Sequence, residues 1–164
     1  MKRSYVPIAG LFMALAVLSA DQASKAWILY GLDLPTLGSI KLLPFLNFTM
    51  VWNHGITFGL LNSAGAMTPY LLGMLALLVV SALGVWLRRS TNVATALPIG
   101  AIAGGAVGNV IDRLRFGAVV DFIHAHAFGY SWYVFNLADA AIVCGVGMLM
   151  IDAVSQGNSK AEKK

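Results

Sequence analysis

The stretch GGAVGNVIDRLRFGAVVDFI, residues 104–123, begins as a run of small and apolar residues and ends in charged ones, among them Asp112, Arg113 and Asp121. A further aspartate, Asp139, lies inside the apolar run FNLADAAIVCGVGMLM, residues 135–150. An ionised side chain near the centre of a bilayer costs about 2.5–3.5 kcal/mol on insertion scales, so such residues are usually paired, close to the interface, or functional. The stretch therefore indicates a membrane helix that ends at a polar site.

The composition of the chain agrees with this interpretation. Of its 164 residues, 59% are hydrophobic and only 11% are charged, which is too little polar surface for a soluble domain of this length. We expect one integral membrane domain over residues 1–164. The formal net charge is +4, but no basic stripe with interleaved aromatic residues is present, and we expect no nucleic-acid partner. A single cysteine, Cys144, excludes an internal disulfide and a CxxC metal or redox pair.

Four apolar stretches are long enough to span a bilayer, which takes roughly 20 helical residues. They cover approximately residues 6–30, 67–87, 93–113 and 133–153. The first stretch has an alternative interpretation as a cleaved signal peptide, because Lys2 and Arg3 precede its apolar core. A retained span is favoured, since apolar character resumes at AWILY and an even number of crossings results.

Basic residues predict the orientation of the spans. They occur before the first span, between the second and third, and after the fourth: Lys2, Arg3, Arg88, Arg89, Lys160, Lys163 and Lys164. With four spans these three places lie on one side of the membrane, the cytoplasmic side by the positive-inside rule. We therefore expect both termini in the cytoplasm.

The two remaining connections then face outward. Apolar residues alternate with polar ones from Leu46 to Trp52, which predicts a strand in an outer β-region of approximately residues 40–62. A turn is expected at residues 53–55 and a second strand over residues 56–60. The connection over residues 115–132 is rich in aromatic residues and is expected to lie along the membrane surface. The predicted fold class is an all-α membrane protein of four transmembrane helices, with a small β-sheet and an interfacial segment on its outer face.

Four carboxylates are expected at the level of the outer leaflet: Asp21, Asp112, Asp121 and Asp139. Asp139 is predicted about two turns into the fourth span. A structural interpretation, in which asparagines and an Asp–Arg pair join the helices, is favoured for Asp21, Lys25 and Asp112. It is weaker for Asp121 and Asp139, which have few cations nearby in sequence.

Two neighbouring carboxylates cannot both ionise easily, so they share a proton, and one acts as general base while the other acts as general acid. Such a pair can hydrolyse a peptide bond, hydrolyse a glycosidic bond, or relay protons in a transporter. Ser24-Lys25 is a poor serine–lysine pair, because adjacent helical residues point about 100° apart. Asp121, His124 and His126 have the spacing of a metal site, but a lone cluster of this kind is a weak signal.

Five blocks of sequence, in order along nearly the whole chain, resemble bacterial lipoprotein signal peptidase, also called signal peptidase II. They are DQASK at 21–25, NHGITFG at 53–59, GGAVGNVIDR at 104–113, VVDFI at 119–123 and FNLADAAI at 135–142. The resemblance implies an intramembrane aspartyl endopeptidase that needs no cofactor. Such enzymes remove signal peptides from prolipoproteins, cutting before a cysteine that bears a diacylglyceryl group.

The resemblance also implies roles for individual residues. The catalytic pair of the family falls on Asp121 and Asp139. The polar residues that hold its substrate fall on Asn53, Asn109, Arg113 and Asn136. Asp21, Lys25 and Asp112 match positions important for integrity rather than for chemistry. Lipid-modified prolipoproteins, membrane lipids and the cyclic peptide antibiotic globomycin are the implied partners.

The rival class is a small proton-coupled transporter, or a structural membrane protein that uses the same carboxylates as a relay or to join helices. The sequence has no inverted repeat, which argues against the usual transporter plan.

Overall fold

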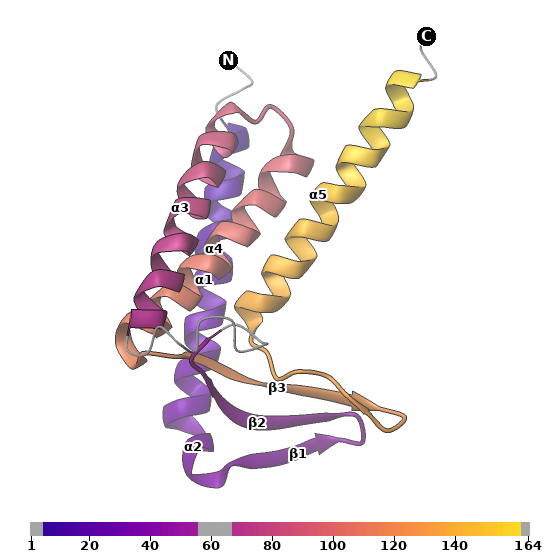
Figure 1. Cartoon of the computed structure of the whole chain (residues 1–164). Helices are drawn as coiled ribbons and strands as arrows, with labels where there is room; N and C mark the ends of the chain where they lie inside the picture. Colours follow the sequence, from indigo (N-terminus) through magenta and orange to yellow (C-terminus); the bar gives the residue numbers. More distant parts are fainter. Residues whose placement is uncertain (1–4, 56–66, 162–164) are drawn as a thin grey trace.

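The computed structural model describes residues 5–55 and 67–161, with side chains up to Ser155. Within these residues, four helices are long and apolar enough to cross a membrane: Tyr5–Gly31, Thr68–Arg89, Val93–Phe116 and Leu137–Ser155. They stand side by side, and a small sheet lies across one end of the bundle (Figure 1). The predicted fold class is therefore confirmed.

The first described helix begins, and the last one ends, at the end of the bundle away from the sheet. Helix α1 (Tyr5–Ala26) continues into the π-helical turn η1 (Trp27–Gly31) and the short helix α2 (Leu34–Leu37) before the chain enters the sheet. Helices α3 (Thr68–Arg89), α4 (Val93–Phe116) and α5 (Leu137–Ala161) complete the bundle. The start of α1 and the end of α5 lie at the end of the bundle opposite the sheet (Figure 1).

Helix α4 is the centre of the bundle. In the most apolar 18-residue segment of α4, 61% of the residues are buried. In the corresponding segments of the other three helices, 17% or less are buried. Small residues permit this: a Cβ added at Gly100 would meet the carbonyl of Gly10 in α1, and one at Gly104 would meet the carbonyl of Ala14. Close approach of backbones through glycine is a common way for membrane helices to associate. The other three helices turn most of their apolar surface outward, as lipid-facing helices do.

The sheet has four antiparallel strands in the order β1-β2-β3-β4. They are β1 (Ser39–Leu43), β2 (Leu46–Asn53), β3 (Val119–Ala127) and β4 (Tyr130–Ser131). Phe48 in β2 packs edge-on against Trp27 in η1 and Phe122 in β3, with ring centroids 6.0 Å and 5.7 Å apart. Buried residues of η1, α2 and β3 form an apolar core beneath the sheet, namely Ile28, Leu29, Leu34, Val120 and Phe122.

The structure corrects two expectations about this region. The predicted strand at residues 46–52 is present, but its partners are β1, which precedes it, and β3, which comes from the other connection. The connection over residues 115–132 therefore contributes β3 and β4 to the sheet, which the sequence did not predict. The second strand predicted over residues 56–60 lies outside the described residues.

The start of the fourth span also differs from the expectation at residue 133. Helix α5 begins at Leu137, because Phe135 still belongs to the sheet region and exchanges backbone hydrogen bonds with Ile123 at 2.8 Å and 3.0 Å. Asp139 consequently lies in the first turn of α5, and not about two turns into it.

Candidate active site

Asp121 and Asp139 come from different kinds of element. Asp121 lies in β3, two residues after the start of that strand, and is 1% exposed. Gly117 directs the chain toward the strand: it ends α4 in the left-handed region with φ 70°, and its N–H donates to the Arg113 carbonyl. Asp139 lies in the first turn of α5 and is half-buried.

A reciprocal pair of hydrogen bonds holds Asp139 at the start of its helix. The N–H of Asp139 donates to Asn136 Oδ1 at 2.9 Å, and the N–H of Asn136 donates to Asp139 Oδ2 at 3.4 Å. This is the geometry of a capping box, in which two residues three apart satisfy each other's free backbone donors. The sequence Asn-x-x-Asp therefore fixes both where α5 begins and where Asp139 lies.

Three asparagines hold the two carboxylates. Asn136 Nδ2 donates to Asp121 Oδ1 at 2.6 Å, and Asn53 Nδ2 donates to Asp121 Oδ2 at 3.0 Å. Asn109 Nδ2 donates to Asp139 Oδ1 at 2.8 Å. Asn136 Nδ2 also donates to Asn109 Oδ1 at 3.2 Å, so the two carboxylates are joined through two carboxamides.

The environment of Asp121 favours its protonated form. Burial, and then the negative charge of Asp139, raise the pKa of Asp121 from 3.8 to about 6, although hydrogen bonds from Asn53 and Asn136 oppose the rise. This is the behaviour of a buried carboxyl group that lies close to a second negative charge. The arrangement can supply both a general base and a general acid up to about pH 6.

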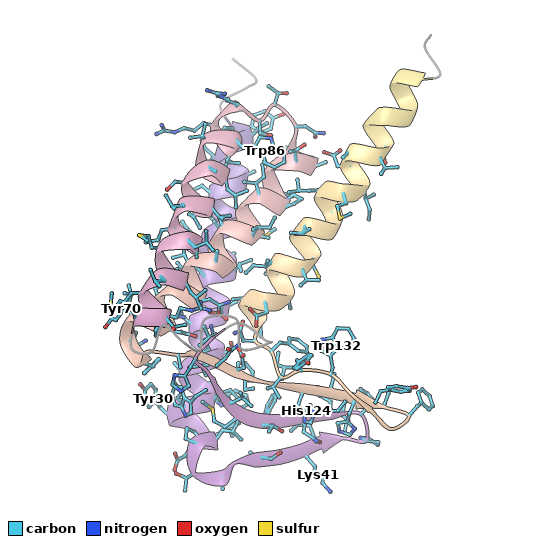
Figure 2. All side chains as sticks on the ribbon, viewed as in Figure 1. Tyr30, Lys41, Tyr70, Trp86, His124 and Trp132 are labelled. Carbon is cyan, nitrogen blue, oxygen red and sulfur yellow. The ribbon has the colours of Figure 1, made fainter. Side chains whose placement is uncertain are left out.

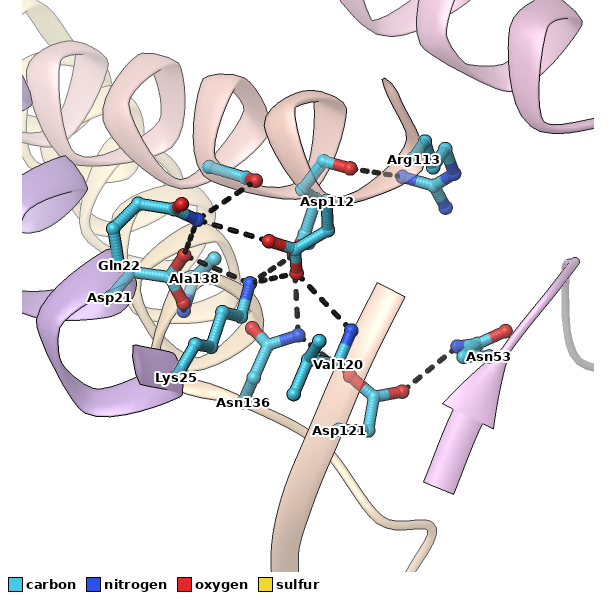
Figure 3. Close-up of polar contacts among 12 residues, drawn as sticks. Asp21, Gln22, Lys25, Asn53, Asp112, Arg113, Val120, Asp121, Asn136 and Ala138 are labelled. Carbon is cyan, nitrogen blue, oxygen red and sulfur yellow. Dashed lines mark hydrogen bonds and ion pairs between the residues drawn. The ribbon is translucent and has the colours of Figure 1, made fainter. Parts of the chain in front are cut away.

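Beside these residues lies a second, buried cluster of charges (Figure 3). Lys25 forms ion pairs with Asp21 at 2.8 Å and Asp112 at 2.7 Å. The expected Asp–Arg pair is thus wrong for Asp112, whose cationic partner is Lys25 on α1. Gln22, which the sequence did not single out, donates to Asp112 Oδ1 at 3.0 Å and to the Gly108 carbonyl at 3.3 Å. Its place beside Asp21 in DQASK was the only signal for it.

Arg113 lies apart from this cluster (Figure 3). Its Nη1 donates to the Asn109 carbonyl at 3.2 Å, while its buried Nε has no partner among the described residues. Arg113 therefore retains donors that are directed at no other described group.

Two alternative sites are not assembled. Ser24 Oγ donates to the Asp21 carbonyl at 2.7 Å, whereas Lys25 is engaged by carboxylates, so the two do not form a catalytic pair. Asp121 and His124 are three residues apart on a strand, so they point to opposite faces. His124 instead contacts Ser131 at 2.6 Å. In residues 5–55 and 67–161, no three metal-binding side chains gather in one place.

A large apolar cavity beside β4 does not contain the aspartates. It has a volume of about 760 Å³ and lies at the far end of the sheet, among Phe45, His126, Tyr130, Trp132 and Tyr133. The polar network, rather than this apolar cavity, carries groups able to transfer protons. The network is therefore the candidate active site.

Comparison with known proteins gives consistent results. The family model described as signal peptidase (SPase) II matches residues 13–155. A lipoprotein signal peptidase of Methylorubrum extorquens (strain PA1) is 48% identical over 145 residues, which cover 88% of this chain and 85% of the relative. Another, of Methylobacterium radiotolerans, is 45% identical and covers 93% of this chain and 89% of the relative.

Solved structures of bacterial membrane enzymes share the fold. One, determined by the in meso method at 2.3 Å resolution, has a TM-score of 0.80 and 30% sequence identity, with coverage of 94% of this chain and 93% of that one. Another, at 1.9 Å resolution, has a TM-score of 0.79 and 29% identity, with coverage of 93% and 97%.

Proposed function

This chain belongs to the signal peptidase II family of membrane proteases, and we propose that Asp121 and Asp139 are its catalytic pair. The family and the relatives assign it the cleavage of signal peptides from prolipoproteins, as the sequence predicted. One observation supports this assignment. Hydrogen bonds through the side chains of Asn136 and Asn109 join the two carboxylates, of which one lies on a strand and the other at a helix N-terminus.

The reaction we propose needs one proton on the pair. The ionised carboxylate takes a proton from a water molecule, whose oxygen attacks the scissile carbonyl. The protonated carboxyl then gives its proton to the departing amine, and the peptide bond breaks. Burial keeps Asp121 protonated in mildly acidic solution, up to about pH 6, which is consistent with its raised pKa.

The substrate in this proposal is a diacylglyceryl-modified prolipoprotein, cut before the lipidated cysteine. Asn53, Asn109 and Asn136 already donate to the carboxylates, so they would hold the pair as well as the substrate backbone. The free donors of Arg113 suit a backbone carbonyl. A globomycin-type cyclic peptide is expected to compete for the same position between the aspartates.

We also propose that the sheet lies at the outer face of the bacterial inner membrane, with both termini in the cytoplasm. Arg88 and Arg89 are the last residues of α3, which ends on the side of the bundle away from the sheet (Figure 1). Trp86 lies near that end of the bundle, whereas Tyr70 and Trp132 lie toward the sheet (Figure 2). Aromatic residues at two levels are typical of the two membrane–water interfaces, where lipid headgroups would contact them.

The test uses the single variants Asp121→Asn and Asp139→Asn and the double variant, with cleavage of lipidated prolipoprotein measured in detergent at matched amounts of folded protein. Each single variant should abolish cleavage, and the double variant should be scarcely worse, because parts of one catalytic unit are strongly non-additive. The matched control is Asp33→Asn, which changes an exposed aspartate at φ 49°, a conformation that asparagine accepts. Substantial turnover by folded Asp139→Asn would refute the assignment.

A further inference from the structure

Lys25 is a buried cation whose donors are all engaged. Its side chain is 3% exposed, and its Nζ lies 2.8 Å from Asp21 Oδ2, 2.7 Å from Asp112 Oδ2 and 3.1 Å from Asn109 Oδ1. An ammonium group has three N–H donors, so these three acceptors use its full capacity. The single cation thus joins α1 to two successive turns of α4.

The two carboxylates on Lys25 each reach the backbone beside one member of the catalytic pair. Asp112 Oδ2 accepts from the N–H of Val120 at 3.1 Å, and Val120 precedes Asp121. Asp21 Oδ1 accepts from the N–H of Ala138 at 3.0 Å, and Ala138 precedes Asp139. The position of the strand relative to the helix therefore depends on two carboxylates that one ammonium group holds together.

Lys25 also sets the orientation of the Asn109 carboxamide. An ammonium group can only donate, so the oxygen of Asn109 must face Lys25. The amide nitrogen then faces Asp139 Oδ1, to which it donates at 2.8 Å. In the reversed orientation, two donors would face each other at Lys25 and two acceptors would face each other at Asp139, and both contacts would be lost.

We propose that Lys25 is a positioning residue for the peptidase reaction: it fixes the separation of Asp121 and Asp139 and the orientation of Asn109, without touching the substrate. The proposal rests on the proposed function, because it concerns the same pair of aspartates. It assigns to Lys25, Asp21 and Asp112 an effect on the chemical step, in addition to their effect on the stability of the fold.

The first test is Lys25→Met, with kcat and KM for cleavage of lipidated prolipoprotein measured separately on folded protein. Misplacing a catalytic group by about 1 Å costs on the order of 100-fold in rate, so kcat should fall by about that factor while KM changes little. The matched control is Lys41→Met, which removes the same charge from an exposed position in β1 and should leave both constants unchanged. Wild-type kcat in folded Lys25→Met overturns the proposal; absence of cleavage by the wild-type protein overturns the proposed function instead.

A double variant tests the path through Asn109. If Lys25 acts through that carboxamide, Lys25→Met combined with Asn109→Ala should have the kcat of Asn109→Ala within a few-fold. A role in stability alone would leave kcat of the folded fraction untouched. If the loss in kcat of the double variant equals the product of the losses of the two single variants, Lys25 does not act through Asn109.

Two further variants address folding, because Lys25→Met leaves two buried carboxylates unpaired. Asp21→Asn/Lys25→Met/Asp112→Asn removes all three charges of the Lys25 cluster, and its amide oxygens can still accept from Val120 and Ala138. It should fold and show the same loss in kcat, and wild-type kcat overturns the proposal.

Gly108→Ala keeps every charge but places a Cβ 2.5 Å from Asp21 Oδ2, which must shift. It should lower kcat, and an unchanged kcat counts against the proposal. Gly147→Ala, where an added Cβ meets nothing within 4 Å, is the matched control and should leave kcat unchanged.

Discussion

Asp121→Asn should abolish catalysis and yet gain stability relative to the wild type as the pH rises from acidic to neutral and alkaline values. The folded pKa of Asp121 is about 6, whereas its ordinary value is 3.8. Folded protein therefore keeps a proton on Asp121 in a pH range in which unfolded protein has released it. The free energy of unfolding contributed by this group falls as pH rises through that window and is fully lost above it.

The magnitude follows from the two pKa values. The difference between 3.8 and about 6, at about 1.36 kcal/mol per pH unit, is roughly 3 kcal/mol. Asparagine does not titrate, so the variant escapes this loss. Asparagine also offers one acceptor oxygen in place of two, so either Asn136 or Asn53 loses its acceptor, at a cost of about 1–3 kcal/mol that does not depend on pH.

The contribution from the titration of Asp121 depends on pH, whereas the cost of the lost acceptor does not. Comparing the stabilities of variant and wild type at several pH values therefore separates the two. At pH 4 Asp121→Asn should be less stable than the wild type. By pH 8 this difference should have shifted in favour of the variant by roughly 2.4 kcal/mol, somewhat less than the full value because unfolded Asp121 is already more than half ionised at pH 4. On the scale of soluble proteins of this length, that shift corresponds to about 5–10 °C in the midpoint of thermal unfolding. The assay is thermal unfolding of both proteins in one detergent at pH 4–8, with Asp33→Asn as the control. Parallel curves for wild type and Asp121→Asn, or a variant that loses relative stability with rising pH, would refute the reasoning.

Arg113→Ala should sharply reduce cleavage, and Arg113→Lys should fail to restore it, because an ammonium group lacks the planar set of donors that remains free here; full activity of Arg113→Lys would argue against a backbone clamp. Cleavage should survive a strong chelator, since two carboxylates suffice for the reaction, whereas a loss that zinc restores would point to His124 and His126 as ligands. Reporter fusions after Arg89 should read as cytoplasmic and fusions at Phe128 as external, and a cytoplasmic signal at Phe128 would contradict the proposed orientation of the sheet. Cleavage should also decline above about pH 6 in kcat/KM, because the free enzyme loses the shared proton there; a profile flat from pH 5 to 8 would contradict it.

The helices could be predicted from the sequence because hydropathy over about 20 residues is a local property. The partners of β2 could not be predicted in this way. Alternation identified the strand at residues 46–52, but Val51 pairs with Asp121 across a long separation in sequence, and local patterns carry no information about such pairing. The nearby turn at residues 53–55 suggested a closer partner instead.

The predicted start of the fourth span at residue 133 was wrong because the apolar residues before Leu137 were counted as part of the helix. Tyr133 and Phe135 are as apolar as the residues that follow, yet Phe135 bonds to Ile123 in the sheet. A signal was present in Asn136-x-x-Asp139, which matches a capping box and marks the first turn of a helix. Weighing that signal above hydropathy would have placed Asp139 correctly.

The residues of the candidate site were named from the sequence, but the hydrogen bonds that connect them were not predicted. The asparagines were expected to hold substrate, and the structure shows that each of them donates to an aspartate. Lys25 was expected to serve integrity alone. Its contact with Asn109 joins residues 84 positions apart, a relation that depends on how closely α1 and α4 approach.

The N-terminal turn of α5 gives the enzyme a fixed order of assembly. A ribosome delivers the spans in sequence, and Asp139 and the N–H of Ala138 arrive only with the last of them. While three spans are in the membrane, Asp21 and Asn109 still lack the partners that α5 supplies, and Asp121 has no second carboxylate with which to share a proton. On the proposed assignment, a chain that stops before α5 lacks one of the two catalytic carboxylates, and we expect cleavage only after the start of α5 has joined the other three spans.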